Sequence, residues 1–276
     1  MFTVFLQKIG QKMGEKVQCR MMHGQKGVIM NIKQLEELAM NAWPSLQTRL
    51  YDGWVLRFAE GYTKRANSVN LIYKSELNPD EKIDFCEMQY GALHLPTIFK
   101  LTESVLSQGI DRKLEERGYK KIDETSVRVL GLEQYACGEN PGITVEDRFS
   151  GRWLDGFFKC SGTADKKEKK TARKMIENIC TEVICVSRQI GEEIVGCGFG
   201  TVERGHVGIF NIAVDRNFRS RGYGKEIMDG ILSQACRRGA RTAYLQVMAG
   251  NLPAEKLYDK LGFTEVYRYW YRCNKC

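Results

Sequence analysis

Residues 143–272 alternate between strand-like and helix-like hydrophobic patterns, and this alternation limits the fold more than any other feature of the chain. Strands carry apolar residues at every second position or in short runs, whereas amphipathic helices carry them at intervals of three or four. The pattern predicts strands at 143–145, 183–186, 194–200, 206–214, 243–247 and 263–272, and helices at 153–160, 166–179, 225–238 and 253–260. Helices packed on a mixed sheet result from this order, so the expected fold class is α/β.

The first half carries a similar but less regular alternation. Its pattern predicts helices at 30–39, 80–91 and 110–117, and strands at 53–58, 68–73, 96–101 and 127–130. Two glycines and a proline then fall within residues 138–142, a composition typical of a connection between domains. We therefore expect one domain over residues 30–137 and a second over residues 143–276.

The first 29 residues differ in pattern from the rest of the chain. Lys26-Gly27-Val28 can be encoded by a purine-rich stretch at ribosome-binding distance from Met30, where an amphipathic helix is predicted to begin. Our hypothesis is that residues 1–29 are an extension produced by an upstream start and that Met30 is the natural start. Peptides from residues 1–29 in the mass spectrum of the native protein would contradict it.

A glycine-rich turn lies between the strand at 206–214 and the next helix. It reads Arg219-Ser220-Arg221-Gly222-Tyr223-Gly224. The first N–H groups of a helix have no partner within the helix, and glycines let an anion approach them closely. The two arginines add cationic donors suited to phosphate. The physics favours a diphosphate site, although such a turn alone also serves as a tight connection. Neither the dinucleotide-binding fingerprint nor the Gly-Lys-Ser/Thr phosphate loop is present.

The surrounding residues make the signal more specific. Ile212-Ala213-Val214-Asp215 precedes Arg219-x-x-Gly222-x-Gly224, and Asn251-x-x-Ala254-x-x-x-Tyr258-x-x-x-Gly262-Phe263 comes after it. In order, spacing and strand–loop–helix setting, residues 143–272 resemble the GNAT superfamily of N-acetyltransferases. The resemblance implies an acyl-CoA N-acyltransferase fold that binds acetyl-CoA as cosubstrate.

The resemblance also assigns roles to residues. Backbone groups of Ile212, Ala213 and Val214 would pair with the pantetheine arm like an added strand. The turn would wrap the diphosphate, and Asn251 and Ala254 would contact the cofactor where neighbouring strands splay apart. Tyr258 would be the general acid that protonates the leaving thiolate. The residues of the turn are Arg219, Ser220, Arg221, Gly222, Tyr223, Gly224 and Lys225.

The general base is not identified by the motif. In the superfamily a carboxylate lies near the start of the strand that holds Ile212, but the matching position here is Gly208. Glu203 and His206 lie nearby and are candidate bases, acting directly or through water; both are also ordinary residues for a surface hairpin. A water chain, or an acceptor amine of lowered pKa, would make a dedicated base unnecessary.

The first half resembles a degenerate copy of the same fold. Leu114-Glu115-Glu116-Arg117-Gly118-Tyr119 aligns with Tyr258-Asp259-Lys260-Leu261-Gly262-Phe263, so Leu114 replaces the acid. No Arg-x-x-Gly-x-Gly turn lies between Trp54 and Leu130. We infer two tandem GNAT-like domains with one cofactor site, in the second half. The polar stretch Gly61 to Ser68 is either a solvated hairpin or, through Arg65, Asn67 or Ser68, part of the acceptor pocket.

Composition excludes several other functions. No apolar run approaches the roughly 20 residues that cross a bilayer, and no secretory signal is present, so we expect a cytoplasmic protein without membrane contact. The net charge of +8 comes without a nucleic-acid recognition motif, and we expect no nucleic-acid partner. The ten cysteines form no disulfide framework and are expected to be reduced; five of them lie in apolar segments typical of a core, namely Cys160, Cys180, Cys185, Cys197 and Cys236. Cys273-x-x-Cys276 lacks further ligands, so no metal site is expected.

Together these features predict an N-acetyltransferase that moves an acetyl group from acetyl-CoA to a primary amine by direct attack, without a covalent enzyme intermediate. The alternative is a regulatory module that binds acyl-CoA without turnover. The missing carboxylate at Gly208 favours the alternative and Tyr258 opposes it. The sequence leaves open the acceptor's identity and whether the protein is a monomer or a homodimer.

Overall fold

A computed structural model describes residues 31–136, 138 and 140–275 of the chain. The first half contains α2 (Ile32–Ala42), β1 (Gln47–Tyr51), β2 (Trp54–Phe58), η1 (Lys64–Ala66), β3 (Val69–Leu71), α3 (Pro79–Gly91), β4 (Ile98–Thr102), η2 (Val105–Ser107), α4 (Ile110–Glu116) and β5 (Lys120–Gly131). The second half contains β6 (Ile143–Glu146), α5 (Gly151–Ser161), α6 (Lys166–Glu177), β7 (Glu182–Ile190), β8 (Glu193–Glu203), β9 (His206–Val214), η3 (Arg216–Phe218), α7 (Tyr223–Arg237), β10 (Thr242–Met248), α8 (Leu252–Lys260) and β11 (Thr264–Cys273). The predicted α/β class is confirmed.

The described strands form one 11-stranded mixed sheet in the order β1-β2-β3-β4-β11-β5-β10-β9-β8-β7-β6. β3 pairs with β4 and β9 pairs with β10 in parallel, and the other neighbours are antiparallel. Read inward from β1 the order is β1-β2-β3-β4-β11, and read inward from β7 it is β7-β8-β9-β10-β5. In both, three antiparallel strands are followed by a fourth that is parallel to the third, and then by a long antiparallel strand. The two halves of the chain therefore build matching parts of the sheet.

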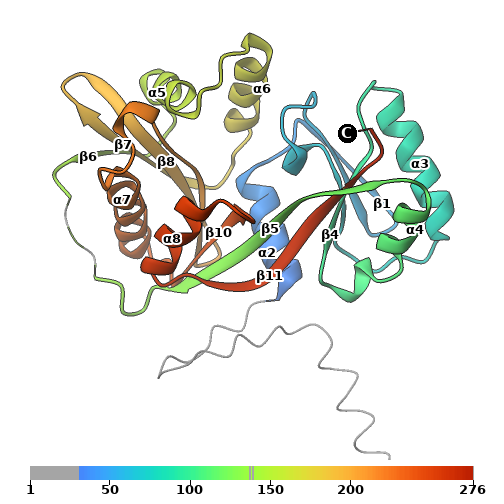
Figure 1. Cartoon of the computed structure of the whole chain (residues 1–276). Helices are drawn as coiled ribbons and strands as arrows, with labels where there is room; N and C mark the ends of the chain where they lie inside the picture. The colour runs from blue at the N-terminus through green and yellow to red at the C-terminus, as the bar shows by residue number, and fades with distance from the viewer. Residues whose placement is uncertain (1–30, 137, 139, 276) are drawn as a thin grey trace, which may run out of the picture.

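The last strands of the two halves are exchanged. β5 ends the first half but pairs with β10 of the second, and β11 ends the chain but pairs with β4 of the first. β5 and β11 also pair with each other, and they run side by side through the middle of the molecule (Figure 1). The backbone of each half is thus completed by a strand of the other.

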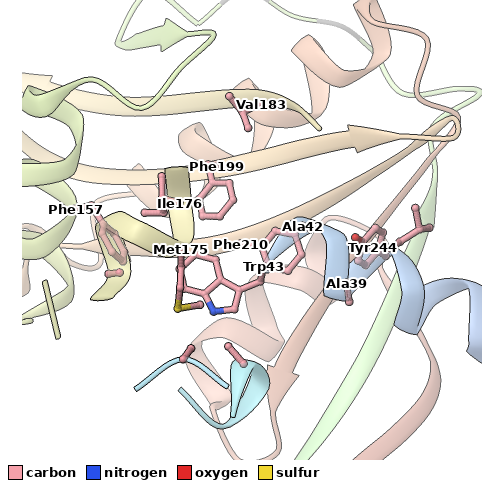
Figure 2. Close-up of a cluster of buried hydrophobic side chains, with 14 of the residues drawn as sticks. Ala39, Ala42, Trp43, Phe157, Met175, Ile176, Val183, Phe199, Phe210 and Tyr244 are labelled. Carbon is pink, nitrogen blue, oxygen red and sulfur yellow. The ribbon is translucent and has the colours of Figure 1, made fainter. Parts of the chain in front are cut away.

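Helices cover both faces of the sheet in the second half. Successive strand residues point to opposite faces: Leu245 packs in the cluster that holds α7 and α8, whereas Tyr244 packs in the cluster that holds α2, α5 and α6. Trp43, directly after α2, lies beside Phe199, with ring centroids 6.0 Å apart (Figure 2). A side chain of the first half therefore packs into the core of the second, and the two halves share the cluster of buried residues around Trp43.

Some local features depart from the predictions. β1 was not predicted, because four of its five residues are exposed and show no alternation. Cys180 is exposed rather than a core residue, and Cys273 is bonded in a disulfide, contrary to the expectation of reduced thiols. The hypothesis about residues 1–29 and Met30 lies outside the described residues.

Candidate functional site

A groove with a volume of about 980 Å³ brings together most of the residues that the sequence assigned to the cofactor. It runs between β9, the start of α7 and one side of α8. The assigned residues that line it are Ile212, Ala213, Val214, Arg219, Ser220, Gly222, Tyr223, Gly224, Lys225, Asn251, Ala254 and Tyr258. Segments separated by some 40 residues in the sequence thus converge on one surface.

The groove lies along a split in the sheet. The parallel ladder between β9 and β10 runs from His206/Thr242 to Ile209/Leu245 and ends there. A bulge in β9 comes next, where the register with β8 shifts and Asn211 adopts a φ of 54°. Beyond this point Ala213 and Val214 still pair with β8, but the edge of residues 212–214 that faces away from β8 has no pairing with β10 and borders the split. An open strand edge of this kind accepts an extended ligand by backbone hydrogen bonding.

The direction of individual N–H groups can be read from the pairing. The N–H of Asp215 donates to the carbonyl of Val195 in β8, at 2.9 Å. Successive N–H groups of an extended strand point to opposite sides. The N–H of Val214 therefore points away from β8, toward the groove.

The part of the groove at the start of α7 carries groups that suit an anion. Gly222 begins α7 with a φ of 86° and no side-chain cap, so the first N–H groups of this 15-residue helix face outward. Arg219 donates from Nε to the carbonyl of Val214, at 3.2 Å, which ties the turn to the end of β9. Lys225 of α7 adds positive charge on this wall, and Lys256 and Lys260 of α8 add it from across the groove. Helix N–H groups and cations together suit a diphosphate.

Arg221 lies outside this arrangement. It does not line the groove; its guanidinium lies 5.2 Å from the centroid of the Phe218 ring and donates to the carbonyl of Asn217, at 3.3 Å. The sequence could not separate Arg219 from Arg221, because both lie in the same irregular turn. The structure places only Arg219 on the groove wall.

Helix α8 supplies the opposite wall. Asn251 begins it, and its side chain accepts from the N–H of Ala254, at 3.4 Å. Tyr258 is 9% exposed and lines the groove. Burial raises the pKa of the Tyr258 phenol above its usual value, so the group keeps its proton at neutral pH. A phenol of this kind can donate a proton to a group bound in the groove.

Glu203 and His206 are far from the groove, which corrects their choice as candidate bases. Both lie at the hairpin between β8 and β9, and His206 is five residues before Asn211, roughly 17 Å along an extended strand. The Glu203 carboxylate accepts from Asn41 Nδ2 at 3.1 Å, and His206 Nδ1 lies 2.6 Å from the carbonyl of Arg204. Burial also lowers the pKa of His206. These contacts stabilise the hairpin and its junction with α2.

Gly208 has no room for a carboxylate. A Cβ atom at this position would lie 2.4 Å from the hydroxyl of Tyr244 and 2.6 Å from the ring of Phe210. Tyr244 is 2% exposed, and burial raises its pKa. A buried neutral phenol therefore fills the space in which a side chain at 208 would begin.

Replacing Gly208 with Glu should destabilise the protein rather than supply a base. Overpacking of this kind costs about 1–3 kcal/mol, which lowers Tm by roughly 3–10 °C in a chain of this size. Thermal unfolding followed by circular dichroism measures it, with Gly151→Glu as control, because no atom lies within 4 Å of a Cβ at Gly151. An unchanged Tm for Gly208→Glu would contradict this account.

The sequence missed several other residues that line the groove. Tyr62 comes from the first half of the chain, and the others come from α5 and the loop after it: Phe157, Cys160, Ser161 and Thr163. The polar stretch around Tyr62 had suggested Arg65, Asn67 and Ser68 instead. Asn67 and Ser68 are buried, and the amide of Asn67 bonds to Ala59 and Thr63 within its own turn. Arg65 lies over the Trp43 ring, 5.9 Å from its centroid.

No group of three or more His, Cys, Asp or Glu side chains in residues 31–136, 138 and 140–275 is arranged to hold a metal ion. Among the helices of that same part of the chain, none combines the length and the apolar character needed to cross a membrane.

Known structures share this fold. A GCN5-related N-acetyltransferase from Kribbella flavida superposes with a TM-score of 0.67 at 14% identity, over 88% of this chain and 95% of the other. A tandem GNAT protein from the clavulanic acid biosynthesis pathway gives a TM-score of 0.59 at 11% identity, over 87% and 86% of the two chains. At identities this low, the superpositions establish the fold alone. This fold is that of the GNAT N-acetyltransferases.

Sequence comparison identifies the family. The family described as "Probable histone acetyltransferase Rv0428c C-terminal" matches residues 30–272. The uncharacterized N-acetyltransferase YobR of Bacillus subtilis is 28% identical over 250 residues, which are 89% of this chain and 99% of YobR. The chain therefore belongs to this acetyltransferase family of the GNAT superfamily, and it is an acyltransferase.

Proposed function

We propose that the protein transfers an acetyl group from acetyl-CoA to a primary amine by direct attack. The observation that carries the proposal is the groove itself, which joins the open edge of β9 to the exposed start of α7. An extended arm ending in a diphosphate has the chemistry to occupy both at once: amides for the strand edge and charged oxygens for the helix N-terminus.

Each predicted residue has a role in this arrangement. The backbone of Ile212, Ala213 and Val214 pairs with the pantetheine arm. Residues 219–225 hold the diphosphate, with Arg219 as the cationic donor and Arg221 supporting the turn through Phe218. Asn251 and Ala254 contact the arm from α8. The volume of the groove, about 980 Å³, lies within the usual range for pockets that hold small ligands and cofactors.

The chemistry depends on the same groups. A neutral amine attacks the thioester carbonyl, and negative charge grows on the carbonyl oxygen. The N–H of Val214, which points toward the groove, stabilises this oxyanion. Collapse expels the thiolate of coenzyme A, whose thiol has a pKa of roughly 8.5 by analogy with cysteine. Tyr258 gives this thiolate its proton.

The base is supplied by solvent rather than by a carboxylate on β9. Glu203 and His206 lie at the far hairpin, and Gly208 faces the hydroxyl of Tyr244. The attacking amine therefore loses its proton to water or enters the groove already neutral. Activity should accordingly rise with pH toward the pKa of the acceptor amine.

Acetyl-CoA binding tests the proposed function. Isothermal titration should give one site per chain, and Arg219→Ala should weaken binding by about tenfold or more, because it removes a charged donor worth roughly 1.5–3 kcal/mol. Arg221→Ala is the matched control and should bind within about twofold of the wild type. A wild-type protein that does not bind acetyl-CoA would refute the proposal, and two sites per chain would refute a degenerate first half.

We also propose that the chain consists of two tandem GNAT-like domains, residues 30–137 and 143–276, of which only the second holds a cofactor. The matching strand orders of the two halves support this division. In the first half, α4 precedes β5 as α8 precedes β11, and Leu114 occupies the position of Tyr258. Leu114 is fully buried in the hydrophobic core of the first half.

A further inference from the structure

A second groove lies where the two halves of the chain meet, and we call it the junction groove. Its volume is about 630 Å³, and none of the residues that line it lines the groove proposed for acetyl-CoA. The first half supplies the end of α2 and strands β1 and β2, and the second half supplies the loop before β7 and the end of β8. One residue from each of these segments, in chain order, is Met40, Leu50, Arg57, Thr181 and Glu203.

Arg57 brings a buried positive charge to the wall of the junction groove. The residue is 4% exposed. Its guanidinium donates to the carbonyl of Arg65 at 2.6 Å, to that of Met40 at 3.2 Å and to that of Trp43. Desolvation lowers the pKa of Arg57 to about 10, so the group stays charged at neutral pH. The three carbonyls occupy three of the five N–H donors of an arginine, and the others are left for a ligand.

This charge has no carboxylate partner within the part of the chain that the structure describes. The Glu36 carboxylate acts on Arg57 electrostatically, but it is bonded to Lys100 Nζ, at 2.5 Å. Glu203 lines the junction groove, and its carboxylate pairs with Arg204 Nε at 3.3 Å. The carbonyls at the end of α2 offset part of the charge on Arg57. They carry partial charges only, and a buried ion without a full counter-charge is costly. The junction groove therefore favours an anion.

Thr181 gives independent support for a ligand. It lines the junction groove, and among the described residues its Oγ1 is buried without a hydrogen-bond partner. Buried hydroxyl groups are normally paired, because burial without a partner costs free energy. An unpaired donor on the wall of a groove fits a ligand that carries acceptor oxygens.

Other residues of the junction groove are apolar. Leu50 is 72% exposed on the edge strand β1, and Tyr73 is also exposed. Met40, Pro44 and Val55 line the same space. A large exposed leucine beside a groove marks a surface that gains free energy when an apolar group covers it. The junction groove thus combines a buried cation with an apolar wall.

We propose that the junction groove binds a monocarboxylate with an apolar tail. The carboxylate bonds to the guanidinium of Arg57 and supplies its missing counter-charge, as arginine and carboxylate groups pair in geometry and charge. The tail lies along Leu50 and Tyr73. This ligand site is separate from acetyl-CoA binding, and its occupant holds the first half against the second.

Octanoate and 1-octanol are the probes, because they share chain length and differ in the head group. Isothermal titration into the full chain, with and without saturating coenzyme A, measures both affinities. The wild type should bind octanoate about tenfold more tightly than 1-octanol, since hydrogen bonds between charged groups are stronger than neutral ones. Coenzyme A should leave octanoate binding unchanged. Equal affinity for the two probes, or no octanoate binding, would overturn the proposal. Octanoate binding that disappears when coenzyme A is added would do so too, because it would lie in the other groove.

Two variants locate the binding. Leu50→Asp should weaken octanoate binding about tenfold or more, because it removes apolar contact and places a like charge beside the head group. Leu93→Asp is the matched control: Leu93 is 51% exposed and does not line the junction groove, so its variant should bind octanoate as the wild type does. Arg57→Met should abolish the preference for octanoate over 1-octanol. Leu50→Asp changes an exposed position and decides the question if Arg57→Met does not fold. Unchanged octanoate affinity in Leu50→Asp would refute the site.

Discussion

Replacing Tyr258 with Phe is expected to lower kcat by about 100-fold or more and to leave the Kd for acetyl-CoA unchanged. General acid catalysis contributes about 10²–10⁴-fold, and this variant removes only the phenolic oxygen. The ring itself should stay in place, since Tyr258 is 9% exposed and packs against Phe263 with centroids 6.0 Å apart. Steady-state release of free coenzyme A gives kcat, and isothermal titration gives Kd.

Tyr73→Phe is the control for this measurement. Tyr73 is exposed and does not line the groove; its phenol donates to Glu37 Oε1 at 3.2 Å. Its phenol should be dispensable, with kcat within about threefold of the wild type. Equal activity of Tyr258→Phe and the wild type would assign the acid role to another group. A wild type that binds acetyl-CoA but acetylates no amine would instead favour the non-catalytic regulatory module.

The second large effect concerns truncation. Residues 143–276, expressed alone, are expected not to fold, although they contain every residue assigned to the cofactor. β11 would lose both of its partners, β4 and β5, and β10 would lose β5 along seven residue pairs. The core would also lose Trp43, which is 2% exposed. The stabilising free energy lost with these unpaired strands and the opened core is larger than the free energy of unfolding of a typical domain.

Circular dichroism during heating is the measurement, and the fragment should show no cooperative transition. Co-expression with residues 31–142 is the control and should restore both the transition and acetyl-CoA binding, because the missing strands are then supplied in trans. A fragment that unfolds cooperatively by itself, as a monomer, would show that the exchanged strands are dispensable.

Local patterns predicted most of the elements but not how they pair. The 3.6-residue period of α7 and the apolar runs of β9 and β10 reflect burial against immediate neighbours, so they are visible in the sequence. β1 escaped prediction because an exposed edge strand imposes no pattern on its side chains. The exchange of β5 and β11 was not predicted for a different reason. The hydrophobic pattern of a strand does not specify its partner, because the choice of partner depends on contacts between residues that are distant in the sequence.

In the candidate site, too, features that are local in the sequence could be predicted, whereas those that depend on distant contacts could not. The turn at Gly222 and the spacing to Tyr258 are local, and the groove contains both. Arg219 and Arg221 differ only in the direction of their side chains, which the turn geometry decides. Tyr62 comes from the first half of the chain, whereas the other residues that line the groove lie in the second half, so no motif joins them. The distance of His206 from the groove becomes visible only when the length of β9 is known.

The exchanged strands also set the order in which the chain can assemble during synthesis. When β5 leaves the ribosome, neither β10 nor β11 has been made, so the edge of β4 that later pairs with β11 is unpaired. Pairing between residues 120 and 273 closes a loop of most of the chain, and contacts of this separation form slowly. The first half therefore remains an incomplete sheet, prone to aggregation, while the second half is synthesised. Its sheet is completed only when the ten residues of β11 have been made.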